Sequence, residues 1–110
     1  MRVEEKGHTI IIKDTLADSA AFLEKVTHEY RSFEKHNLIL DISHDKGVTE
    51  KSITMFIPLS KMHRKAKKSF VLVTNDIDFN SVPVSLVVVP SLLEAHDIIE
   101  MEEIERDLGF

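Results

Sequence analysis

Three short, nearly continuous apolar segments constrain the fold of this chain most strongly. They span 38–42, 70–73 and 86–89 and are rich in Leu, Ile and Val. Apolar runs of this length without strict alternation are typical of strands that are covered on both faces of a sheet. Because helical patterns lie between and after them, the sequence predicts an α/β fold in which parallel strands are joined by right-handed crossovers.

The N-terminal segment predicts a hairpin at the edge of this sheet. Residues 8–13 contain three consecutive isoleucines, a β-branched run of strand type, and residues 2–5 can pair with it across a turn at 6–7. The expected architecture is a mixed sheet of about five strands packed against α-helices. A chain of 110 residues has the length of one such domain, which we expect to span 1–110.

Three helices are predicted. The first is capped at 18–19 and runs to about Lys35. The second spans about 50–68, and Pro58 inside it is expected to kink or split it because proline lacks the N–H group that a helix needs. The third begins at Ser91, which opens an S-x-x-E capping box.

Each predicted helix carries an apolar stripe that is expected to face the sheet, because apolar residues recur at spacings of three and four. The stripes consist of Ala20, Leu23, Val26, Tyr30 and Phe33 in the first helix, Met55, Leu59, Met62 and Ala66 in the second, and Ile98, Met101 and Leu108 in the third.

The charge pattern argues against a nucleic-acid partner. The chain carries 14 Lys and Arg against 19 Asp and Glu, a net charge of −5, which disfavours broad binding to a phosphate backbone. The basic stretch 61–68 is interpreted as a solvated helix end, where cations suit the helix dipole, and the acidic stretch 94–107 as a solvated helix face. No apolar run approaches the roughly 20 residues of a membrane span, so we expect a cytoplasmic protein.

The motifs of common enzymes and cofactor sites are missing from the sequence. The chain has no cysteine, which excludes disulfides and thiolate metal sites, and its three glycines lie too far apart for a phosphate-binding loop. Its six histidines show no metal-binding spacing. Ser43, His44 and Asp41 do not form a catalytic set, because neighbours on a strand point to opposite faces. We therefore predict no catalytic residue, no metal and no cofactor.

The order of elements and several local strings resemble the STAS domain, the fold of anti-sigma-factor antagonists. Residues 38–43 look like the central strand that leads into that family's signature loop. The predicted helix at 50–68 followed by 70–73 resembles its next helix and strand, and 86–89 followed by the capped helix resembles its C-terminal end. The resemblance implies a non-enzymatic regulatory module that docks to a protein partner, such as a regulatory kinase or an anti-sigma-like protein.

Antagonists of this family carry a phosphorylatable residue in a D-S-[ST]-G motif, and the matching stretch here is 49–52. The family's acceptor serine falls on Glu50, which presents a fixed negative charge. The motif is therefore degenerate, and Thr49 and Ser52 are the substitute acceptors.

We expect the docking surface at the loop and first helical turn after the central strand, because function in open α/β sheets gathers beyond the carboxyl ends of parallel strands. The predicted contact residues are His44, Asp45, Gly47, Thr49, Glu50, Ser52 and Ile53.

Other interpretations stay open at this point. The segment 75–85 is shorter than the helix that the STAS domain has there, so the face that it leaves exposed could bind a small ligand or a lipid. The chain is also similar to small stand-alone proteins that share the string at 100–109, some of which bear the name ribonuclease Z. A hydrolase is less favoured, because that nuclease's H-x-H-x-D-H zinc motif is absent. A homodimer through the sheet edge or an apolar helix face is a further possibility.

Overall fold

The structure of the chain is a computed structural model that describes residues 1–75 and 77–109. These residues contain a sheet of five strands in the order β1-β2-β3-β4-β5. The first two strands are antiparallel, and the remaining neighbours are parallel. The strands are β1 (Arg2–Lys6), β2 (Thr9–Lys13), β3 (Asn37–Asp41), β4 (Phe70–Val73) and β5 (Val87–Val89). The predicted α/β fold, with its mixed sheet and N-terminal hairpin, is confirmed.

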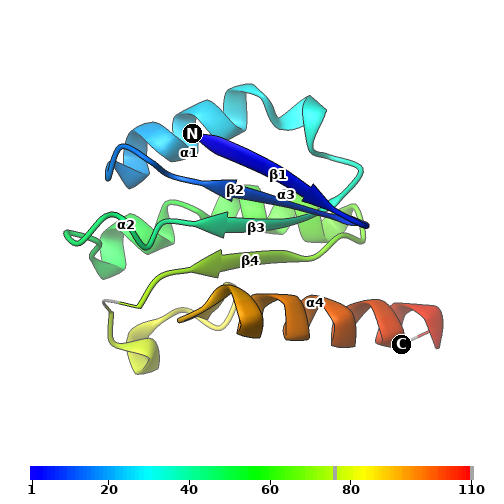
Figure 1. Cartoon of the computed structure of the whole chain (residues 1–110). Helices are drawn as coiled ribbons and strands as arrows, with labels where there is room; N and C mark the ends of the chain where they lie inside the picture. Colours follow the sequence, from blue (N-terminus) through cyan, green and yellow to red (C-terminus); the bar gives the residue numbers. More distant parts are fainter. Residues whose placement is uncertain (76, 110) are drawn as a thin grey trace.

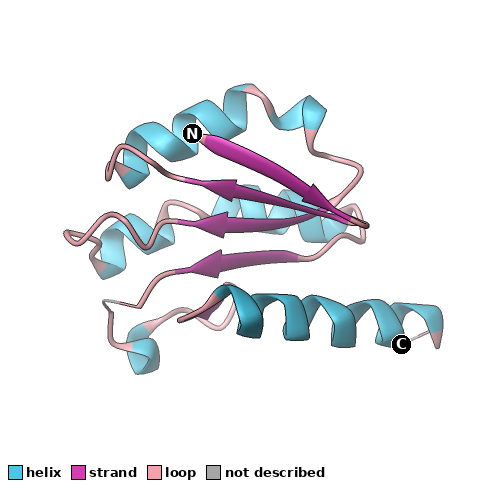
Figure 2. Ribbon diagram, viewed as in Figure 1, coloured by secondary structure: helices cyan, strands magenta, loops and turns pink. Residues whose placement is uncertain are grey.

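Helices cover both faces of the sheet (Figures 1 and 2). Those that connect the strands pack on one face, and the C-terminal helix packs on the other, where it contacts β3, β4 and β5. The helices are α1 (Ser19–His28), α2 (Glu50–Thr54), α3 (Ile57–Lys65) and α4 (Leu92–Asp107), with short 3-10 helices η1 (Tyr30–Ser32) and η2 (Phe79–Ser81).

The core consists of two layers because side chains alternate along each strand. The larger layer lies under α1, α2 and α3, and the smaller one under α4. Strand residues of the first layer are Ile10, Ile12, Leu38, Leu40, Phe70 and Leu72. Strand residues of the second layer are Ile11, Ile39, Val71, Val73 and Val89. Each interior strand is thus apolar on both faces, which explains its unbroken apolar sequence.

The first helix is shorter than predicted. α1 ends at His28 instead of Lys35, and the chain continues as the 3-10 helix η1. Tyr30 lies in η1, and its hydroxyl oxygen is 2.6 Å from Nδ1 of His63 in α3. This tertiary contact explains why the α-helix does not continue through Tyr30. The predicted stripe is also partly wrong, since Phe22 is buried in α1 where Ala20 is exposed.

The break predicted at Pro58 is confirmed, because the second helix is divided into α2 and α3 and the proline lies in the first turn of α3. The predicted stripe of this region is mostly wrong, because Leu59 is the one member of it that is buried. Met62 is 47% exposed, whereas Phe56 and His63 are buried. The break shifts the helical phase between α2 and α3, so a stripe drawn through one continuous helix selects the wrong face.

The predicted stripe of the C-terminal helix is right only for Ile98, which is half-buried and packs against the smaller core layer. Met101 is 60% exposed and Leu108 is also exposed, whereas Ala95 and Ile99 are buried against the sheet. Apolar residues occur on both sides of α4, so helical spacing alone does not indicate which side packs.

Ala17 adopts the left-handed conformation, with φ of 56°, in the turn that leads into α1. A Cβ atom makes this conformation costly by about 1–2 kcal/mol, and glycine avoids that cost. We therefore expect Ala17→Gly to raise the free energy of unfolding by about 0.5–1 kcal/mol in urea titration, after the added freedom of the unfolded chain is subtracted. The matched control is Ala20→Gly, in the first turn of α1, which is expected to lower stability. A loss of stability in Ala17→Gly would contradict the prediction.

Candidate functional site

The predicted docking residues lie at the carboxyl edge of the sheet, which we define as the edge where β2, β3 and β4 end (Figure 1). The loop after β3 runs along this edge into α2. His44, Gly47, Thr49 and Glu50 are exposed there, and Asp45 is half-buried. The structure therefore brings together the loop and helical turn that the sequence singled out.

Asp45 holds this loop against the start of α1. Its Oδ1 accepts a hydrogen bond from the Gly47 amide at 2.9 Å, and its Oδ2 accepts one from the Ser19 amide at 3.1 Å. The bond from the Ser19 amide is the main reason that the pKa of Asp45 lies below its usual value. Asp45 is therefore an ionised positioning residue of the loop at neutral pH.

Thr49 and Ser52 form a reciprocal capping box at the start of α2. Thr49 Oγ1 accepts from the Ser52 amide at 3.2 Å, and Ser52 Oγ accepts from the Thr49 amide at 3.3 Å. The two hydroxyl oxygens are 3.1 Å apart. Thr49 is the more accessible of the two, because Ser52 is half-buried.

Ile53 differs from the other predicted contact residues because it is only 1% exposed. It helps to line a cavity of about 280 Å³ between α2 and the segment that contains η2. Apolar and acidic side chains line this cavity, which we call the rim cavity: Val48, Ile53, Ile77 and Val82, with Ser81 and the carboxylates of Glu50 and Asp78. Ile53 is thus part of its apolar lining. Residue 76 of the segment 75–85 lies outside the described residues.

Buried polar groups close the end of the central strand. Asp41 Oδ1 accepts from both the amide and the hydroxyl of Ser43, at 2.9 and 2.6 Å. Within residues 1–75 and 77–109, no hydrogen bond joins His44 to either residue, and no three His, Asp or Glu side chains converge to hold a metal ion. Asp41 and Ser43 therefore terminate the strand.

A buried polar cluster around His63 has no clear signal in the sequence. His63 Nε2 donates to the carbonyl oxygen of His36 at 2.7 Å, which assigns the proton to that nitrogen and makes Nδ1 the acceptor for the Tyr30 hydroxyl. Burial lowers the pKa of His63 and raises that of Tyr30. His63 and Tyr30 are therefore both uncharged at neutral pH, and their hydrogen bond connects η1 to α3.

The acidic C-terminal helix is less solvated than predicted. Glu102 pairs with Arg64 at 3.2 Å, and Glu103 Oε2 accepts from Asn37 Nδ2 at 3.2 Å. Arg106 donates to Ser69 Oγ at 3.1 Å and to Asn37 Oδ1 at 3.3 Å. These contacts lie at the amino edge of the sheet, where β3 and β4 begin, and they anchor α4 there. The acidic stretch is therefore in part an attachment to the sheet.

The fold and its edge define an α/β protein with four parallel strands, one antiparallel edge strand and an exposed loop at the carboxyl edge. A comparison with protein-family models finds no match, and a comparison with curated protein sequences finds none either. No helix among the described residues combines the length and apolar character that crossing a lipid bilayer requires.

Proposed function

We propose that this protein is a non-enzymatic, cytoplasmic regulatory module of the STAS type that binds a protein partner through the loop and helical turn at 44–53. The observation that carries the proposal is an exposed, rigidly held loop beside an apolar cavity at the carboxyl edge. Asp45 and the capping box hold the backbone in place, so a partner meets a preorganised surface. The order of strands and helices supports the proposal, with η2 in place of the helix that the STAS domain has between β4 and β5.

The rim cavity indicates the chemistry of the partner. Its lining combines apolar side chains with the carboxylates of Glu50 and Asp78. An apolar anchor residue next to a Lys or Arg fits such a site, because the anchor is desolvated and the cation meets a carboxylate. A regulatory kinase or an anti-sigma-like protein that presents such a segment is the partner class that we propose.

Phosphorylation of Thr49 or Ser52 would act on this surface by adding negative charge beside Glu50. Thr49→Asp mimics this change and keeps the start of α2 intact, because aspartate is also a good helix cap. We expect Thr49→Asp to tighten binding of the partner by about threefold or more, since the added negative charge beside Glu50 attracts the cation that the partner presents. The measurement is quantitative co-purification from the native host followed by titration with the isolated partner.

The matched control is Ser91→Asp, which makes the same kind of cap substitution at α4. It is expected to leave binding unchanged within about twofold. Equal or weaker binding by Thr49→Asp than by wild type, or an equal change in both variants, would remove the 44–53 surface from the proposal. Mass spectrometry of the protein from its host then shows whether either hydroxyl carries a phosphate.

The rim cavity also favours a second candidate function, the binding of a small apolar ligand. Its volume of about 280 Å³ is near the lower end of ligand sites, and four apolar side chains line it. Two carboxylates in the lining disfavour a fatty acid, whose headgroup is also negative. Native mass spectrometry of the purified protein separates the two functions, since a retained ligand that Ile53→Glu abolishes would favour the second.

A further inference from the structure

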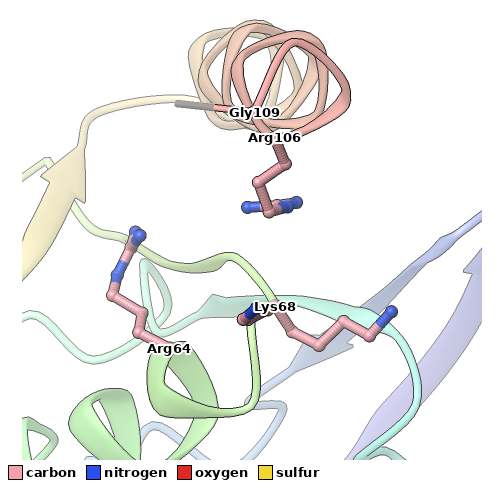
Figure 3. A pocket seen from close by; sticks show the side chains of 5 residues that line it. Arg64, Lys68, Arg106 and Gly109 are labelled. Atoms are coloured by element: carbon pink, nitrogen blue, oxygen red, sulfur yellow. The ribbon is translucent and has the colours of Figure 1, made fainter.

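A second cavity lies at the amino edge of the sheet, opposite the proposed docking surface. It has a volume of about 360 Å³ and lies between the turn after α3 and the last turn of α4 (Figure 3). Four cationic side chains and one glycine line it: Arg64, Lys67, Lys68, Arg106 and Gly109. We call it the amino-edge pocket.

Neighbouring groups hold the two guanidinium groups of this pocket in place. Arg64 Nη2 donates to the carbonyl oxygen of Phe70 at 3.0 Å, and Arg106 donates to Ser69 and Asn37. Figure 3 shows the two arginine side chains extending into the gap from opposite sides. Arg64 Nη1 also donates to both carboxylate oxygens of Glu102, at 3.3 and 3.2 Å. A guanidinium group has five N–H donors, so each arginine keeps donors that these bonds do not use. The pocket therefore presents fixed, unused donors.

Positive charge is in excess at this pocket. Among the described residues, Glu102 is the carboxylate within ion-pairing distance of these four side chains, and it contacts Arg64. Glu103, the next acidic residue, binds Asn37 and His8 instead. Within the described part of the chain, four cations of this pocket therefore have one paired carboxylate, a balance that favours an anionic ligand.

The backbone at Lys67 is a separate observation. This residue follows the cap of α3 and has φ of 65°, the left-handed conformation that glycine usually supplies after a helix. A lysine there accepts strain of about 1 kcal/mol or more and contributes a cation to the pocket. Strain of this kind gathers at functional sites, which supports a binding role.

We propose that the amino-edge pocket binds a small phosphate-bearing anion with at least two negative charges, of the pyrophosphate or sugar-bisphosphate class. Guanidinium groups match the geometry of phosphate oxygens, and the lysines add point charges. Among residues 1–75 and 77–109, no aromatic ring on which a nucleobase could stack lines the pocket, so we propose a small anion and not a nucleic acid. This site is independent of the proposed docking function because it lies at the other edge of the sheet.

The test is isothermal titration calorimetry of the whole chain with inorganic pyrophosphate and with a hexose bisphosphate. Sodium sulfate and sodium chloride at equal ionic strength serve as salt controls, and a short single-stranded RNA serves as a competing ligand class. The test variant is Lys67→Gln/Lys68→Gln. The matched control is Lys61→Gln/Lys65→Gln, which removes two exposed charges from α3, the helix just before this turn, outside the lining of the pocket.

We expect saturable binding of at least one phosphate compound, weakened about tenfold or more in Lys67→Gln/Lys68→Gln and by less than about twofold in the control. Circular dichroism verifies that both variants are folded. No saturable binding beyond that of sulfate would overturn the proposal. Equal weakening in both variants would overturn it too, because it would reflect general charge, and so would tighter binding of RNA than of either phosphate compound.

Discussion

Replacement of His63 by alanine is expected to lower the free energy of unfolding by about 3–4 kcal/mol. His63 is 0% exposed, and its ring joins three parts of the chain. Without it the Tyr30 hydroxyl and the His36 carbonyl lose their partners, and a cavity opens beside Phe70, whose ring centre lies 6.3 Å from that of His63. Urea titration followed by circular dichroism measures the effect.

Ser60→Ala is the matched control for this prediction. Ser60 lies on the same helix and is equally buried, but its hydroxyl has no hydrogen-bond partner among the described residues. Its removal is expected to change stability by less than about 1 kcal/mol or to raise it, because an unpaired buried hydroxyl is costly. A loss as large as that of His63→Ala would show that any change in α3 is destabilising, and the assigned role of the ring would be wrong.

The protonation of His63 is expected to make the free energy of unfolding depend on pH. Burial, and to a smaller extent the positive charges of Lys68 and Arg64, lower the pKa of His63 below 6.5. The unfolded chain therefore binds the proton more readily than the folded one. Stability is complete above pH 6.5 and declines as pH falls from 6.5 toward the lowered value. His63→Gln, which does not titrate, is expected to show a shallower decline in this range, and identical slopes would contradict the prediction.

Replacement of Asn37 by alanine is expected to cost about 2–3 kcal/mol and to loosen the C-terminal half of α4. Asn37 is 2% exposed, at the start of β3. Its Oδ1 accepts from the buried Ser69 amide at 2.9 Å and from Arg106, and its Nδ2 donates to Glu103. The substitution removes the hydrogen-bond partner that the Asn37 side chain gives to the Ser69 amide, Arg106 and Glu103, and Ser69 is fully buried. Urea titration measures the loss, and hydrogen exchange of α4 amides locates it.

Glu105→Ala provides the control for Asn37→Ala, because Glu105 is an exposed residue of α4, the helix that Asn37 anchors. Its effect is expected to stay within about 0.5 kcal/mol. The pair Asn37→Ala and Arg106→Gln is expected to be less than additive, because both changes remove the same contact. Full additivity, or hydrogen exchange in α4 that does not change, would show that the helix is held by its apolar contacts alone.

The candidate docking site was largely predictable because its signals are local. A polar loop after a buried strand, followed by Thr49 as a helix cap, is readable from neighbouring residues. The rim cavity was not predictable, because Ile77 and Val82 reach it from a segment about 25 residues further along the chain. The link from Asp45 to the start of α1 was hidden for the same reason.

The amino-edge pocket was even less predictable from the sequence than the rim cavity. The basic stretch 61–68 is evident in the sequence, and by itself it fits a solvated helix end. Arg106 lies nearly 40 residues further along the chain, within an acidic stretch, and only the packing of α4 on β3 and β4 brings it to the turn after α3.

The sequence by itself determined the strands, the hairpin, the helix caps and the break at Pro58, because each depends on the conformational preferences of adjacent residues and on local periodicity. Tertiary structure alone decided which side of each helix is buried, where α1 ends and which charges meet at each edge. Those outcomes depend on contacts between segments far apart in the chain, such as Tyr30 with His63 and Asn37 with Arg106, whose energies no local pattern contains.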